Sequence, residues 1–137
     1  MQKTKLLLTG LLLNAAIATS ALAAQNPLSV HVLNLQDGLP SAGVNVKLEK
    51  KVDDKWVQIN EGVTNAQGRI PALYPSESTM EKGSYRVTFQ TEEWFNKQKT
   101  ATFFPEIPVI FKADGSVPHY HIPLLLSPYG FSSYRGN

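Results

Sequence analysis

Alternation of apolar and polar residues with a period of two runs through most of this chain, and it limits the possible folds more than any other feature. The segment LSVHVLN at 28–34 places Leu28, Val30 and Val32 on one side, and VNVKLEK at 44–50 repeats the pattern. Successive side chains of a strand point to opposite faces of a sheet, so both segments predict half-buried strands. Further strands are predicted at 55–63, from Arg69, at 84–90, at 103–111, at 119–127 and after Pro128.

Turn-forming residues separate these segments. QDGLPSAG lies between the first two strands, a pair of aspartates follows at 53–54, and NAQG occupies 65–68. Asn, Asp, Gly and Pro are the residues that tight turns favour. Pro105 and Pro108 fall within the 103–111 segment. Because proline cannot donate to a strand ladder, we expect that strand to have an edge or bulged position.

One segment, TEEWFNKQK at 91–99, is predicted to be helical. Thr91 is the predicted N-cap, two glutamates follow it, and lysines stand near the end, as the helix dipole favours. About eight short strands with one short helix predict an all-β fold in which two sheets form a sandwich.

The first 23 residues have the features of a secretory signal peptide. Lys3 and Lys5 precede a run rich in leucine and alanine, which ends in the small-residue pattern Ala21, Leu22, Ala23. By length alone the uncharged run could be a retained membrane anchor, but the Ala-x-Ala ending favours cleavage before Ala24. We therefore expect one domain at 24–137 that is exported to the periplasm and has no membrane contact after cleavage.

The charge and cysteine content narrow the classes of partner. The chain has 13 basic and 11 acidic residues, and because Lys3 and Lys5 lie in the leader, 11 of each remain in the predicted mature part. A balanced surface of this kind gives no support for nucleic-acid binding. The chain has no cysteine, so the exported fold must be held by its core or by subunit association instead of disulfides.

The three histidines lie on predicted strand faces that point away from the core. His119 and His121 share one face of their strand with Pro123 and Leu125, and His31 lies opposite the valines of its own strand. An outward face that is also apolar suggests a subunit contact or a ligand cleft.

The sequence contains no motif for several common kinds of catalytic or binding site. Phosphate loops, nucleophile elbows and helical metal motifs are missing. The simplest interpretation of a lone histidine is a hydrogen-bonded surface residue. A metal site at His119 and His121 would need a third ligand, and no carboxylate partner is near in sequence. We expect no metal and no cofactor.

Four segments resemble the transthyretin-related proteins, and specifically their 5-hydroxyisourate hydrolase branch. They are LSVHVLN, the NAQGR turn, FFPEIPVIF and HYHIPLLLSPYGFSSYRG, and the resemblance covers essentially all of 24–137. Hydrolases of this branch typically end in Tyr-Arg-Gly-Ser, which the hormone carriers lack. Here Tyr134, Arg135 and Gly136 match, and Asn137 departs from the pattern.

The resemblance implies a transthyretin-like sandwich that assembles as a homotetramer, a dimer of dimers around a central channel. It also implies that the first strand pairs with the strand after the QGR turn and with the 119–127 strand. His31, Arg69 and His121 would then share one outward face, with Tyr134 closing the floor of the channel.

The resemblance further implies a cofactor-free reaction in purine catabolism. Water adds at a ring carbonyl of 5-hydroxyisourate and opens the ring amide, giving 2-oxo-4-hydroxy-4-carboxy-5-ureidoimidazoline. The implied catalytic residues are His121, which activates water, His31, which orients substrate or water, and Arg69, which donates to the carbonyl and enolate edges. The implied substrate-binding residues are Tyr134, Arg135 and Asn137.

The roles of His119 and Asn137 are considered separately. His119 is expected at the rim as a structural residue. Asn137 could hold the water, leave that task to the chain-terminal carboxylate, or slow the reaction, because an amide is a poor proton relay. The competing classes are a non-catalytic sandwich that binds a small ligand and an envelope metal carrier that uses His119 and His121.

Overall fold

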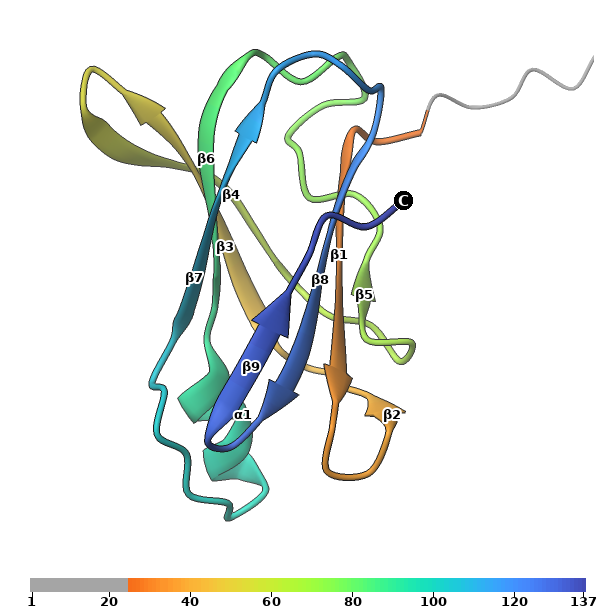
Figure 1. The fold of residues 1–137 in the computed structure, drawn as a ribbon, viewed down its shortest axis with the longest axis vertical. Coiled ribbons are helices and arrows are strands. Elements are labelled where there is room, and N and C mark those ends of the chain that lie inside the picture. Colours follow the sequence, from red (N-terminus) through yellow and green to blue (C-terminus); the bar gives the residue numbers. More distant parts are fainter. Residues whose placement is uncertain (1–24) are drawn as a thin grey trace, which may run out of the picture.

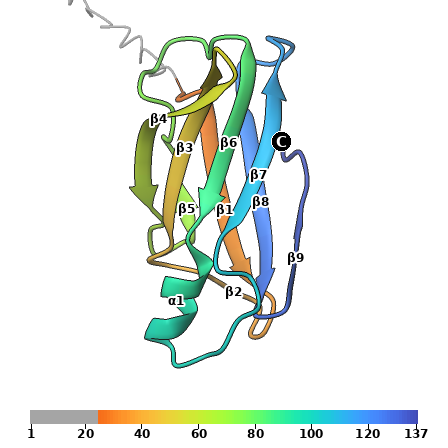
Figure 2. The ribbon, with the colours of Figure 1, turned by 90° about the vertical axis from the view of Figure 1, so that its left-hand side faces the viewer.

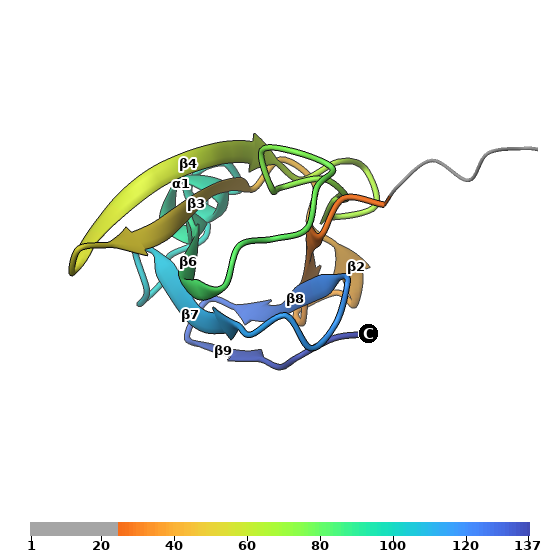
Figure 3. The ribbon, with the colours of Figure 1, turned by 90° about the horizontal axis from the view of Figure 1, so that it is seen from above.

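Two β-sheets face each other across one core (Figures 1, 2 and 3). The computed structural model describes residues 25–137, so the predicted leader at 1–23 lies outside the described residues. The first sheet has the order β2-β1-β8-β9, with β5 also paired to β1, and the second has the order β4-β3-β6-β7. Within residues 25–137 no helix is long and apolar enough to cross a membrane.

The described elements are short. The first sheet contains β1 (Leu28–Asn34), β2 (Leu39–Pro40), β5 (Arg69–Ile70), β8 (Tyr120–Ser127) and β9 (Gly130–Ser133). The second contains β3 (Asn45–Val52), β4 (Lys55–Val63), β6 (Gly83–Phe89) and β7 (Ile107–Ala113), and the helix α1 spans Thr91–Lys97. This arrangement confirms the predicted all-β sandwich with one short helix. The two-residue β2 was not predicted, because it is too short for a periodic pattern.

Two local predictions were wrong, and both errors lie around α1. The strand predicted at 103–111 begins only at Ile107, because the chain before it binds the helix: Glu92 donates its main-chain N–H to the Pro105 carbonyl oxygen. Thr91 is not the N-cap but a buried helical residue, and its hydroxyl donates to the Phe104 carbonyl oxygen at 2.8 Å. The Thr91 hydroxyl therefore bonds to a distant main-chain group, Phe104, and does not cap the helix.

The predicted edge position of the proline-bearing strand is confirmed. Among residues 25–137, β7 pairs only with β6 and forms one border of the second sheet, with Pro108 inside it. The aspartate pair at 53–54 also turns as predicted. Both residues have positive φ, which is the backbone that a two-residue hairpin between β3 and β4 requires.

The position of β1 organises the first sheet. β8 lies parallel to one side of β1, whereas β2 and β5 lie antiparallel to the other side (Figure 1). The parallel register places Ser29 beside His121, and the antiparallel register places His31 beside Arg69. Residues from three distant parts of the sequence therefore share one outward face.

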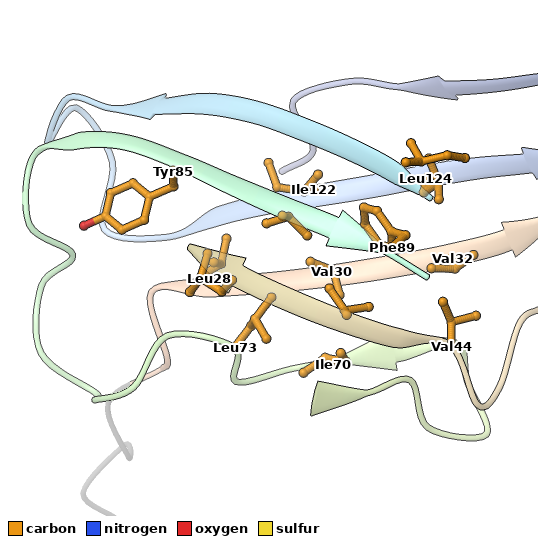
Figure 4. Close-up of a cluster of buried hydrophobic side chains, with 14 of the residues drawn as sticks. Leu28, Val30, Val32, Val44, Ile70, Leu73, Tyr85, Phe89, Ile122 and Leu124 are labelled. Carbon is orange, nitrogen blue, oxygen red and sulfur yellow. The ribbon is translucent and has the colours of Figure 1, made fainter. Parts of the chain in front are cut away.

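Alternate residues of the same strands form the core. Leu28, Val30 and Val32 of β1 are fully buried, as are Leu124 and Leu126 of β8. Figure 4 shows several of these side chains meeting Tyr85 and Phe89 of β6 between the sheets. Burial of one face also fixes which side chains point outward, because a register shift of one residue would exchange the two faces.

Gly68 brings β5 close to β1. Its φ is +70°, its carbonyl oxygen accepts a 2.8 Å hydrogen bond from Val32 N–H, and a Cβ there would lie 2.6 Å from the Val32 carbonyl oxygen. Only glycine fits both the conformation and the space. This close approach sets the adjacent Arg69 beside His31.

Replacement of Gly68 by alanine is expected to destabilise the fold more than the matched replacement of Gly38. Gly38 also has a left-handed φ, +74°, but open space around it, so Gly38→Ala costs about 1–2 kcal/mol in backbone strain. Gly68→Ala adds a steric clash worth about 1–3 kcal/mol. Urea unfolding of the two variants measures the difference. Equal loss in both variants would show that β5 and β1 do not approach as described.

Candidate active site

The outward face of the first sheet carries a cleft of about 550 Å³. The polar residues that line it are Gln25, Ser29, Arg69, His119, His121, Arg135 and Asn137. They come from the segment before β1, from β1, β5 and β8, from the residues just before β8 and from the segment that follows β9. Four of the six predicted site residues therefore line this one cleft: Arg69, His121, Arg135 and Asn137.

His31 and Tyr134 occupy different positions. His31 is half-buried and is the direct ladder partner of Arg69, so it lies on the same face as the cleft without being among its lining residues. Tyr134 lines a neighbouring cleft of about 320 Å³, together with Ile110 of β7 and Tyr120 of β8. His121 and Arg135 border both clefts, and the Arg135 guanidinium carbon lies 5.9 Å from the centre of the Tyr120 ring.

The segment after β9 runs beside β8 and contacts the imidazole of His121. Gly136 N–H donates to the His121 carbonyl oxygen at 3.0 Å, and a Cβ on Gly136 would lie 2.4 Å from Cδ2 of His121. No larger residue fits at 136 while the imidazole keeps its position. The sequence presented Gly136 only as part of a tetrapeptide resemblance, whereas the structure gives it a steric reason.

Sequence analysis missed the hydrogen-bond partners of His121 on β8 and of His119 just before it. Ser29 Oγ lies 2.8 Å from Nε2 of His119 and 2.7 Å from Nδ1 of His121. Nδ1 of His119 lies 2.7 Å from the main-chain carbonyl oxygen of Asn26. The placement of Ser29 on the same strand face as His31 was visible in the sequence, but its pairing with β8 was not.

Burial and positive charge lower the pKa of both site histidines. For His31 the larger cause is desolvation and the second is the Arg69 guanidinium, while a hydrogen bond with the Gln67 main chain opposes them. For His121 desolvation is again the largest cause, followed by Arg69, His119 and His31, while a hydrogen bond with the Ser29 main chain opposes them. The lowered pKa favours the neutral form of both imidazoles, which can accept a proton.

Neutral imidazoles beside guanidinium groups suit base-assisted attack on a polar, electron-rich substrate. The arginines Arg69 and Arg135 line the cleft, and no Asp or Glu is among its lining residues. Guanidinium groups offer paired donors to carbonyl and enolate oxygens. Within residues 25–137 there is no group of three or more His, Cys, Asp or Glu that could hold a metal ion.

Comparison with known proteins assigns this arrangement to a family. Residues 28–136 match the HIUase/Transthyretin family, and the chain belongs to that family. A 5-hydroxyisourate hydrolase of Salmonella dublin is 51% identical over 123 residues, which cover 90% of each chain.

Solved structures agree with the assignment. Sea bream transthyretin in complex with thyroxine has a TM-score of 0.75 and 34% identity, over 80% of this chain and 94% of that one. The 5-hydroxyisourate hydrolase of Klebsiella pneumoniae has a TM-score of 0.69 and 35% identity, over 80% of this chain and 98% of that one.

Replacement of Arg69 by glutamine is expected to raise the pKa of both His31 and His121. The positive charge of Arg69 is the second cause of each shift, and burial remains, so both pKa values should rise yet stay below 6.5. Histidine titration by NMR measures this. Arg86→Gln is the matched control, because Arg86 pairs with Glu49 on the other sheet. Unchanged histidine titration in Arg69→Gln would contradict the placement of Arg69.

Proposed function

We propose that this protein hydrolyses 5-hydroxyisourate by opening its ring amide. The observation that carries the proposal is the convergence of His121, Arg69 and His31 on one face of a chain that is half identical to 5-hydroxyisourate hydrolases. Transthyretin shares the sandwich, so the fold does not distinguish a hydrolase from a carrier. The cleft residues supply the distinction, because a base beside two guanidinium groups is suited to hydrolysis.

His121 is the proposed general base. Its imidazole lines the cleft, its pKa is lowered, and it can take a proton from a water molecule that attacks the substrate carbonyl. Arg69 stabilises the oxyanion that develops on that carbonyl. His31, beside Arg69, orients the substrate or the water. The products keep every atom of substrate and water: one C–N bond breaks, one C–O bond forms, and the nitrogen receives a proton.

Arg135, Tyr134 and Asn137 are the proposed substrate-binding residues. Arg135 and Asn137 line the cleft that holds His121, and Tyr134 lies on the neighbouring cleft that His121 and Arg135 also border. Asn137 stands where the hydrolases carry serine. Its amide can hold a water molecule by hydrogen bonding, and with His31, Arg69 and His121 all in place we expect activity to be retained.

Removal of the His121 imidazole is expected to lower kcat/KM for freshly made 5-hydroxyisourate by roughly 10²- to 10⁴-fold, the usual contribution of a general base. Ring opening is followed by ultraviolet absorbance for wild type, His121→Ala and Asn137→Ser. Asn137→Ser should have a rate of the same order as wild type. Because the pKa of His121 is lowered, the wild-type rate should begin to fall only below pH 6.5.

Two outcomes would contradict these assignments. A wild-type rate in His121→Ala would remove the general base, and activity that appears only in Asn137→Ser would show that the amide blocks the reaction. A chelator in the assay tests the metal-carrier alternative, which the comparisons do not favour. Continued turnover with chelator present is expected.

We further propose that the protein assembles as a homotetramer. Large apolar side chains are exposed on the isolated chain near β7 and β9, among them Ile110 at 61%, Phe103 at 71% and Tyr129 at 71%. Apolar surface of this extent on a soluble protein favours a subunit contact. A native mass four times that of the subunit is expected, and a monomer at micromolar concentration would contradict the proposal.

We also propose export to the periplasm with cleavage before Ala24. The support is the sequence of the first 23 residues, where two lysines precede an apolar run and an Ala-x-Ala ending. Cell fractionation and the mass of the mature chain test both points. Full-length protein in the cytoplasm would contradict them.

A further inference from the structure

A single chain of hydrogen bonds links His121 to the protein main chain through Ser29 and His119. The four groups in order are the Asn26 carbonyl oxygen, the His119 imidazole, the Ser29 hydroxyl and the His121 imidazole, with neighbouring atoms 2.7, 2.8 and 2.7 Å apart. All three distances are those of well-formed hydrogen bonds. The series of hydrogen bonds begins at the Asn26 carbonyl oxygen, which can only be an acceptor.

With His119 in its neutral form, that fixed beginning determines every later donor. His119 must carry its proton on Nδ1 to donate to Asn26, so in the neutral ring Nε2 is the acceptor. Ser29 therefore donates its hydroxyl hydrogen to Nε2 of His119. With that hydrogen used, Ser29 Oγ accepts from His121, whose proton must then be on Nδ1.

We propose that Ser29 is a positioning residue that holds His121 in the tautomer with the proton on Nδ1 and the lone pair on Nε2. The inference rests on the proposed hydrolysis, because this is the tautomer that lets Nε2 take a proton from water in the cleft. In many hydrolases a carboxylate fixes the tautomer of the catalytic histidine. Here a neutral hydroxyl, anchored through His119, does so.

The strand pairing holds Ser29 beside His121. Ser29 and His121 are direct partners in the parallel β1–β8 ladder, and Ser29 is half-buried. The other charged or titratable groups that act on His121 are Arg69 from β5, His31 from β1 and His119 just before β8, and Arg135 lines the same cleft. None of these side chains is a hydrogen-bond acceptor for Nδ1 of His121 in the described residues, although the Ser29 main chain also forms a hydrogen bond with this imidazole.

The test combines nitrogen NMR of the imidazoles with the ring-opening assay. In wild type we expect His121 with a protonated Nδ1 and an unprotonated Nε2. Ser29→Ala should shift His121 toward the Nε2–H tautomer, which free imidazole side chains prefer, and lower kcat by about 10- to 100-fold with little change in KM, as loss of an orienting partner does. Ser29→Thr keeps the hydroxyl on a residue that suits a strand and should restore both the tautomer and most of the rate.

Two further variants sharpen the test. His119→Phe removes the acceptor of the Ser29 hydrogen but leaves Ser29 Oγ able to accept from His121, so a smaller loss than in Ser29→Ala is expected. Ser127→Ala is the matched control: its hydroxyl lies at the far end of β8 and donates to the Gly130 carbonyl oxygen. It should change neither the His121 spectrum nor the rate.

The outcomes separate this inference from the proposed function. Wild-type His121 with its proton on Nε2 would overturn the inference even if Ser29→Ala failed to fold, and so would a Ser29→Ala variant with unchanged tautomer and rate. An Nδ1–H tautomer in a wild type that does not open the ring of 5-hydroxyisourate would overturn the proposed hydrolysis while the hydrogen-bond chain stood.

Discussion

The parallel ladder between β1 and β8 is the contact on which both the fold and the candidate site depend. It joins residues 28–34 to residues 120–126 in one continuous register. On the inner side it buries Leu28, Val30 and Leu124 in the core. On the outer side the same register sets Ser29 beside His121. A shift by one residue would place the imidazole in the core, so the apolar packing that holds the sheets together also fixes the chemistry of the cleft.

The site combines cationic groups with two histidines, His31 and His121, whose pKa values are lowered. Arg69 and Arg135 border the cleft, and burial together with the charge of Arg69 disfavours a second positive charge on His121. These two features complement each other in a hydrolase, because a neutral imidazole can accept the proton of the attacking water while a guanidinium group stabilises the oxyanion that the attack produces. A carrier of small aromatic ligands would have no need of this combination.

Local sequence patterns predicted what depends on neighbours in the chain, and missed what depends on distant contacts. The alternation at 28–34 and 119–127 correctly placed the core faces, and the resemblance suggested the partners of β1. The start of β7 and the role of Thr91 were missed, because both are set by contacts between α1 and the segment before β7. Ser29 was missed because its partners His119 and His121 lie some 90 residues further along, beyond the reach of any periodic signal.

The separation between the strands that pair around β1 has a consequence for biosynthesis. A ribosome makes β1 early, but that strand has no β8 to lie against until residues 120–127 have emerged, and Gly136 must follow before the imidazole of His121 is enclosed. The nascent polypeptide therefore holds an unpaired apolar strand until residues 120–127 have been made, and its cleft is complete only after Gly136 has been added.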